Sequence, residues 1–175
     1  MHEAEKLPPA HLILMGVCGS GKTTIAEILA QRSGFELIEA DEFHPAENVE
    51  KMSQGQPLTD EDRWPWLEKL SNWLQKQDSA GKRTVVTCSA LKRIYRDKLR
   101  LADVPLIFVH LDGPRELLLK RLSHRTDHFM PASMLDSQLD TLESLQLDEL
   151  GFAVDIDDTP EGIAATIMER LNAVA

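Results

Sequence analysis

The feature that most constrains the fold is a glycine-rich stretch between an apolar segment and an amphipathic one. Residues 12–15 (LILM) have the composition of a buried strand, and residues 24–32 carry apolar side chains at helical spacing. Between them, residues 16–23 read GVCGSGKT and match the pattern GxxxxGK[ST]. Glycines let such a loop turn so that successive backbone N–H groups converge on phosphate oxygens, and the helix that follows adds its positive end. The sequence therefore predicts a nucleoside-triphosphate site.

Two side chains of this loop have expected roles in that site. Lys22 is expected to reach the β- and γ-phosphates, and the Thr23 hydroxyl is expected to hold Mg²⁺. The alternative is a glycine-rich turn without a ligand, which the strand and helix on either side disfavour. The predicted nucleotide-binding residues are Gly16, Val17, Cys18, Gly19, Ser20, Gly21, Lys22 and Thr23.

Strands and helices alternate along the rest of the chain. The predicted strands are 12–15, 36–40, 84–88, 105–111 and 152–156, and the predicted helices are 24–32, 60–77, 91–101, 114–125, 132–145 and 160–173. In the helix 91–101, the apolar pattern predicts a buried Ile94 and an exposed Arg96. The alternation implies βαβ units, so we predict an α/β fold with three layers, α/β/α, around a parallel five-stranded sheet. A length of 175 residues indicates one domain, 1–175.

Composition excludes several classes of partner. The formal net charge of -10 makes nucleic acid a poor partner, and an anionic small substrate needs a locally basic pocket. No run of residues is apolar and long enough to span a membrane, and no signal peptide is readable. Only two cysteines occur, without a zinc-binding pattern or a disulfide framework, so we expect a cytoplasmic protein.

A pair of acids follows the second predicted strand. Glu39 and Asp41 are two residues apart and share a face at the carboxyl end of that strand, where ligands bind in open α/β sheets. A carboxylate there can orient a Mg²⁺-bound water or accept the proton of an attacking hydroxyl. The alternative is a pair of solvated loop acids. A GTPase switch is disfavoured because NKxD is absent and the DxxG at residues 78–81 follows a polar segment.

With GVCGSGKT, EADEFHP, LTDEDRWPWL and CSALKRIYRD in this order, the chain resembles the gluconate kinases, a family of small P-loop sugar-acid kinases, from about His11 to the last helix. The resemblance implies ATP-dependent phosphorylation of D-gluconate to 6-phospho-D-gluconate, with ATP and Mg²⁺ as cofactors. It also implies a nucleoside-monophosphate-kinase-like fold, with a substrate-binding helical region at about 44–80 and a lid at about 120–140. Glu39 departs from the family pattern, which usually carries Asp there.

The resemblance assigns roles residue by residue. It implies catalytic roles for Lys22, Asp41, Arg121 and Arg125, substrate contacts from Asp41, His44, Arg63 and Lys92, and metal contacts from Thr23 and Asp41. Arg63 has independent support, because a cation at the start of a helix is unfavourable unless it binds an anion such as a carboxylate. The alternative for Arg63 is an ion pair with its acidic neighbours. Arg121 and Arg125 are four residues apart on one helix face, so the alternative for them is a solvated face.

Two other functions stay open at this point. The acceptor of the phosphoryl group is gluconate, shikimate or another small hydroxy acid. A non-catalytic, ATP-binding switch is the alternative outside the enzymes. The resemblance also raises the expectation of a homodimer, although no interface is readable in the sequence.

Overall fold

The computed structural model of the chain describes residues 9–124 and 132–174. Its sheet has five strands in the order β2-β3-β1-β4-β5, and all adjacent strands pair in parallel. The strands are β1 (His11–Met15), β2 (Glu36–Glu39), β3 (Thr84–Thr87), β4 (Leu106–Asp112) and β5 (Gly151–Asp155). The predicted α/β fold with a parallel five-stranded sheet is confirmed.

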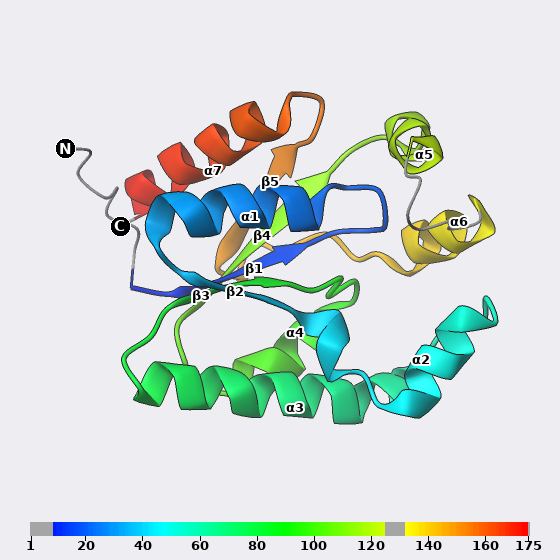
Figure 1. The fold of residues 1–175 in the computed structure, drawn as a ribbon, viewed down its shortest axis with the longest axis horizontal. Helices are drawn as coiled ribbons and strands as arrows, with labels where there is room; N and C mark the ends of the chain where they lie inside the picture. The colour runs from blue at the N-terminus through cyan, green and yellow to red at the C-terminus, as the bar shows by residue number, and fades with distance from the viewer. Residues whose placement is uncertain (1–8, 125–131, 175) are drawn as a thin grey trace.

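Helices cover both faces of this sheet. α1 and α7 lie on one face, and α3 and α4 lie on the other, which completes the three layers (Figure 1). The helical elements are α1 (Lys22–Ser33), the 3-10 helix η1 (Ala40–Phe43), α2 (Ala46–Ser53), α3 (Asp60–Ser79), α4 (Arg93–Arg100), α5 (Arg115–Ser123), α6 (Ala132–Thr141) and α7 (Pro160–Val174). Among the described helices, none has both the length and the apolar composition needed to cross a membrane.

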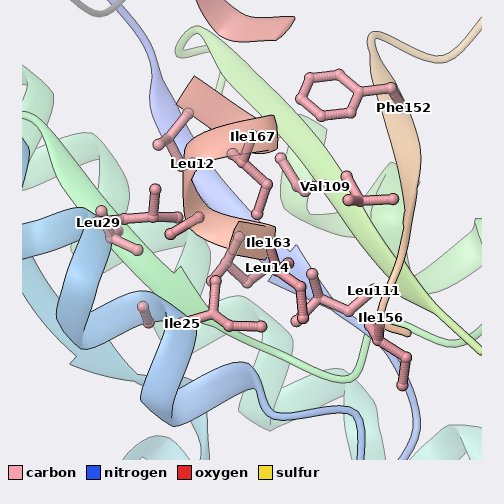
Figure 2. Close-up of a cluster of buried hydrophobic side chains, with 14 of the residues drawn as sticks. Leu12, Leu14, Ile25, Leu29, Val109, Leu111, Phe152, Ile156, Ile163 and Ile167 are labelled. Carbon is pink, nitrogen blue, oxygen red and sulfur yellow. The ribbon is translucent and has the colours of Figure 1, made fainter. Parts of the chain in front are cut away.

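The central strand β1 separates two hydrophobic cores. Leu12 and Leu14 point into the core under α1 and α7, which Figure 2 shows, whereas Ile13 and Met15 point into the core under α3 and α4. Successive side chains of a strand alternate between faces, so a strand covered on both sides is apolar throughout. This burial fixes β1 in the middle of the sheet, and the glycine-rich loop therefore begins at its centre.

Several predicted boundaries differ from the structure. η1 and α2 were not predicted, and α6 ends at Thr141 rather than continuing to Leu145. Residues 142–150 lack helical structure because the backbone there contacts the 89–91 segment, with the Glu143 N–H donating to the Leu91 carbonyl at 2.7 Å. The helix predicted to reach Arg125 ends at Ser123.

The predicted exposure on α4 was wrong at two positions. Arg96 is fully buried, whereas Ile94 is 46% exposed. Arg96 is buried because Glu149 lies opposite, with Arg96 Nε to Glu149 Oε1 at 2.7 Å and Nη2 to Oε2 at 3.0 Å. Arg100 Nη2 also donates to Glu149 Oε1, at 2.7 Å.

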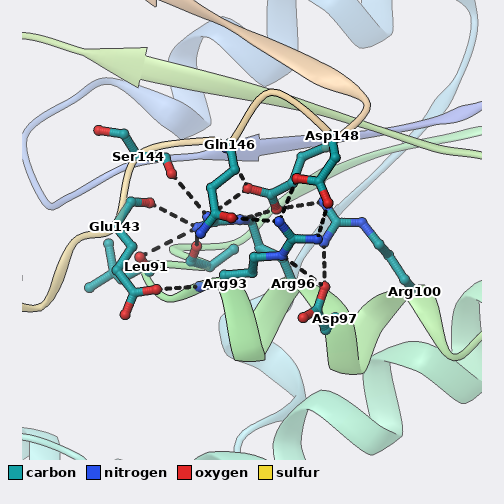
Figure 3. Close-up of polar contacts among 11 residues, drawn as sticks. Leu91, Arg93, Arg96, Asp97, Arg100, Glu143, Ser144, Gln146 and Asp148 are labelled. Atoms are coloured by element: carbon teal, nitrogen blue, oxygen red, sulfur yellow. Dashed lines mark hydrogen bonds and ion pairs between the residues drawn. The ribbon is translucent and has the colours of Figure 1, made fainter.

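The buried arginine joins three segments of chain. Arg96 Nη1 donates to the carbonyls of Ala90 at 2.9 Å and of Glu143 at 3.1 Å, so α4, the turn after β3 and the 142–150 segment meet at one side chain (Figure 3). Ala90 has a φ of 44°, a left-handed conformation that is uncommon for a residue with a side chain. The arginine therefore holds the turn that follows β3 in place.

Candidate active site

The glycine-rich loop has the backbone shape that the sequence predicts. Gly16 has a φ of 151°, and a Cβ there would lie 2.9 Å from the Leu111 carbonyl oxygen. Gly19 has a φ of 83°, and a Cβ there would lie 3.0 Å from the Leu118 carbonyl oxygen. Only glycine fits both positions without strain. The loop is thus held tightly against β4 and α5.

The lysine of the loop lies across it. Lys22 Nζ donates to the carbonyls of Gly16 at 2.8 Å and of Val17 at 3.1 Å. α1 begins at Lys22, directly after the loop, so the positive end of the helix dipole and the ammonium group lie at the same place. Backbone amides, a helix N-terminus and a lysine together form a cradle for the phosphates of a nucleotide.

A cavity of about 230 Å³ opens next to this loop. It lies at the carboxyl edge of the sheet and is bounded by the loop, the ends of β2 and β3, the start of α3 and one face of α6. The predicted site residues that line the cavity are Cys18, Gly19, Gly21, Lys22, Thr23, Asp41, His44 and Arg63. These predicted residues come from three separate segments of chain and are brought to one cavity.

An acid and a hydroxyl meet at the floor of the cavity. Thr23 Oγ1 donates to Glu39 Oε1 at 2.7 Å, and Asp41 also lines the cavity, with its side chain 82% exposed. Hydroxyl and carboxylate oxygens are the ligands that Mg²⁺ prefers, and such sites commonly use one or two carboxylates together with substrate phosphates. No group of three or more His, Cys, Asp or Glu side chains that could hold a metal occurs within the described ranges. The oxygen atoms of Thr23, Glu39 and Asp41 are too few to hold a metal ion alone, but they fit a Mg²⁺ ion whose other ligands come from a nucleotide.

His44 is held as a neutral ring. It stacks on Trp66 with ring centroids 4.1 Å apart, and Asn48 Nδ2 lies 3.1 Å from His44 Nδ1. Burial lowers the pKa of His44, and the Arg63 charge lowers it further, although the Asp41 charge opposes both. Because Asn48 occupies Nδ1 as a donor, the ring proton lies on Nε2, which is 3.9 Å from Asp41 Oδ1. His44 is thus placed to donate a hydrogen bond next to Asp41.

Arg63 is oriented by Tyr95 rather than by an acid. Its Nη1 donates to the Tyr95 hydroxyl at 3.0 Å and to the Leu58 carbonyl at 2.5 Å, and its guanidinium carbon lies 5.0 Å from the Tyr95 ring centroid. Burial and the hydrogen bond to Asp60 raise the pKa of Tyr95, so the phenol stays protonated and its O–H donates a hydrogen bond to Asp60. Among the described residues, Arg63 makes no ion pair, which contradicts the alternative of pairing with its acidic neighbours.

Within the phosphate loop, Gly16, Val17 and Ser20 do not line the cavity, and outside the loop Lys92 and Arg121 do not line it. Lys92 pairs with Asp60 at 3.0 Å and does not line the cavity. Arg121 donates to the carbonyls of Ile156 and Asp158. Arg125 lies outside the described residues. The roles of Lys92, Arg121 and Arg125 in binding or catalysis stay predictions.

The sequence analysis missed one wall of the cavity, which comes from α6. Met134, Ser137, Gln138 and Thr141 line it, at the i, i+3, i+4, i+7 spacing of a single helix face. That spacing was visible in the sequence, but the face mixes apolar and polar side chains and carried no motif. Gln138 reaches furthest, because its Oε1 accepts a hydrogen bond from the Cys18 backbone N–H at 2.7 Å. The contact between Glu39 and Thr23 was likewise not predicted from the sequence.

Comparisons with known proteins agree on one family. An AAA-domain family model matches residues 12–145. The chain is 49% identical over 173 residues to a gluconokinase of Gluconobacter oxydans (strain 621H), covering 98% of this chain and 97% of that protein. It is also similar to the crystal structure of a gluconokinase from Sinorhizobium meliloti 1021, with 43% identity, a TM-score of 0.89, and coverage of 97% of this chain and 95% of that one.

A more distant likeness supports the fold alone. The APS kinase of Mycobacterium tuberculosis, solved in complex with AMPPNP and APS, superposes with a TM-score of 0.67 at 15% identity, over 94% of this chain and 99% of that one. The layered arrangement of sheet and helices is therefore shared with that structure.

Proposed function

The chain belongs to the gluconokinase family, and we propose that it transfers the γ-phosphoryl group of ATP to the 6-hydroxyl of D-gluconate, giving 6-phospho-D-gluconate and ADP. One observation supports this proposal most strongly. The cavity of about 230 Å³ is lined by the phosphate loop on one side and by Asp41, His44 and Arg63 on the other. A phosphoryl donor and a hydroxy-acid acceptor can therefore meet within it.

The donor binds along the loop of residues 16–23. Its backbone amides and the Lys22 ammonium bind the β- and γ-phosphates of ATP. Thr23, with Glu39 and Asp41, would hold Mg²⁺, which would neutralise charge on the phosphate oxygens of ATP. Lys22 Nζ, bonded to the loop carbonyls at 2.8 and 3.1 Å, lies close enough to exchange those carbonyls for phosphate oxygens.

The acceptor binds against Asp41, His44 and Arg63. Arg63 binds the carboxylate of gluconate with its planar fork, and the His44 Nε2–H donates to a hydroxyl of the sugar acid. Asp41 accepts the proton of the 6-hydroxyl as the 6-oxygen of gluconate bonds to the γ-phosphorus. The bond between the γ-phosphorus and the β,γ-bridging oxygen breaks, and ADP leaves with that electron pair.

The wider organisation is part of the same proposal. Residues 44–80 form the gluconate-binding region and residues 120–140 form a lid, with Arg121 and Arg125 neutralising charge on the phosphoryl group and Lys92 assisting substrate binding. Mg²⁺ as the cofactor, a cytoplasmic location and a homodimer belong to the proposal as well. The location is supported by two cysteines that form no disulfide in the described structure.

A coupled assay of ADP release tests the proposal directly. We expect Mg²⁺-dependent ADP release that gluconate stimulates strongly and that shikimate and other small hydroxy acids stimulate weakly. Mass spectrometry of the product should identify 6-phosphogluconate. Slow ATP hydrolysis that no acceptor accelerates would favour the non-catalytic switch, and a preference for shikimate would replace the acceptor.

A further inference from the structure

α6 places an amide side chain directly on the phosphate loop. Gln138 Oε1 accepts from the Cys18 N–H at 2.7 Å, a contact between residues 120 positions apart in the chain. The amides of this loop form the cradle that binds phosphate, and Gln138 also lines the cavity that holds Lys22 and Asp41. Its carboxamide therefore lies at the junction of the donor and acceptor sides.

Docking of α6 does not depend on this contact. Leu135 is fully buried in the core under α1 and α7, and Arg115 Nε donates to Asp136 Oδ1 at 2.6 Å across the outside of the helix. The burial of Leu135 attaches the helix to the core, and the exposed pair of Arg115 and Asp136 adds little to it. Gln138 thus contributes something other than the attachment of α6.

The orientation of the carboxamide defines what it can offer. A carboxamide has one acceptor oxygen and one –NH₂ group with two donors. The Cys18 N–H occupies the oxygen, and Nε2 makes no hydrogen bond to any residue in the described parts of the chain. Two hydrogen-bond donors are therefore held beside the loop, in a cavity that Glu39 and Asp41 also line.

We propose that Gln138 contacts the transferring phosphoryl group, with Oε1 held by the Cys18 amide and Nε2 donating to a γ-phosphate oxygen. This inference rests on the proposed kinase function and adds a residue to its site. Charge spreads over the γ-phosphoryl oxygens during transfer, so a neutral donor fixed in advance stabilises that state more than the ground state. ADP has no γ-phosphate and gains nothing from the contact.

Two substitutions separate this role from a structural one. Gln138→Glu keeps an oxygen acceptor for the Cys18 amide but replaces the donors with a negative charge facing the phosphoryl group. Gln138→Leu removes the acceptor and the donors without adding charge. Removal of one donor to a developing oxyanion commonly costs about 10²–10³ in kcat, so we expect a loss of at least about 10²-fold in Gln138→Glu and a smaller one in Gln138→Leu.

The control variant is Ser133→Asp, which adds the same charge to the same helix at an exposed position that does not line the cavity. We expect its kcat to stay within about twofold of wild type, since exposed charges interact weakly in water. Calorimetry gives a readout apart from turnover. A non-hydrolysable ATP analogue should bind about tenfold or more weakly to Gln138→Glu, whereas ADP should bind with nearly unchanged affinity.

The outcomes distinguish this inference from the proposed function. If the wild-type protein releases no ADP on addition of gluconate, the proposed function fails and the inference fails with it. If the wild type is active and Gln138→Glu retains its kcat and its preference for the ATP analogue, only the inference is overturned. Gln138→Leu decides the question if Gln138→Glu does not fold, because wild-type kcat in that variant also overturns the inference.

Discussion

Replacing Glu149 with glutamine should destabilise the protein far more than any exposed charge change near it. The carboxylate is fully buried and accepts hydrogen bonds from Arg96, Arg100 and the backbone N–H of Gln146. Glu149→Gln keeps the size of the side chain but removes the negative charge. Two arginines then face a neutral amide whose –NH₂ group cannot accept their hydrogen bonds.

Two independent arguments give similar values for the loss of free energy of unfolding in Glu149→Gln. Burial alone would raise the pKa of Glu149, but hydrogen bonds from Arg96, the Gln146 amide and Arg100 outweigh it and lower the pKa from 4.5 to about 2. That lowering corresponds to about 3 kcal/mol of stability while the carboxylate is ionised. Independently, breaking a buried ion pair by removing one partner costs about 3–5 kcal/mol. For a chain of this length, about 3 kcal/mol lowers Tm by about 6–12 °C.

The matched control lies in the same cluster of side chains. Asp148 makes two hydrogen bonds with Arg93, at 2.5 and 2.8 Å, but its side chain is 68% exposed. Asp148→Asn should lower the free energy of unfolding far less than Glu149→Gln, because exposed ion pairs contribute little. Urea unfolding at pH 7, followed by tryptophan fluorescence, measures both variants. Equal losses in the two variants, or a loss below about 1 kcal/mol in Glu149→Gln, would refute the reasoning from burial.

The ion pairs of Glu149 also predict how the stability of the protein depends on pH. Because the folded-state pKa of Glu149 lies below its ordinary value of 4.5, its contribution to stability is present above pH 4.5 and is lost as pH falls toward 2. The free-energy difference between wild type and Glu149→Gln should therefore be constant between pH 5 and 7 and shrink at pH 3. A difference that grows as the solution becomes more acidic would contradict the assigned direction of the pKa change.

Three substitutions test the proposed site. Asp41→Asn should lower turnover by about 10²–10⁴-fold, the range for loss of a general base, while calorimetry finds ADP binding nearly intact; wild-type turnover would remove Asp41 from its role. Arg63→Ala should mainly raise the KM for gluconate, because the arginine binds a group remote from the reacting oxygen, and a fall in kcat alone would count against it. Iodoacetamide should inactivate the enzyme more slowly with MgATP present than with gluconate alone, because Cys18 lines the cavity at the phosphate loop. Cys18→Ser should abolish this effect, since burial raises the pKa of Cys88 to about 12 and keeps that thiol protonated; equal inactivation of Cys18→Ser and wild type would refute it.

The parts of the fold that the sequence predicts are those with local causes. β1 is apolar at each of residues 12–15 because it lies between two helical layers, and Gly16 and Gly19 are required by backbone conformations that only glycine adopts easily. Both signals are contained in a few consecutive residues. α2 was missed because it is only eight residues long and most of those residues are polar.

In the site, too, the residues placed by local sequence were predicted and those placed by distant packing were not. Lys22, Thr23 and Asp41 lie within a few residues of a strand end, so knowing the strand places them at the carboxyl edge of the sheet. Gln138 reaches the same cavity from a helix 120 residues after Cys18, and its position depends on how α6 docks. The spacing of apolar residues in α6 does not specify where the helix docks, because its position is set by the burial of Leu135 against distant elements.

Two arginines show which charged residues can be assigned a role from the sequence alone. Arg63 follows three acids at the start of a helix, where the helix dipole opposes a cation, so the conflict was visible locally and predicted a ligand-binding role. Arg96 presents no local conflict, because a cation on the polar stripe of an amphipathic helix is ordinary. Its burial is caused by Glu149, 53 residues later, which offsets the cost of desolvating the charge. A charged residue is therefore predictable from sequence when its conflict is with its own backbone, and unpredictable when its partner comes from another part of the fold.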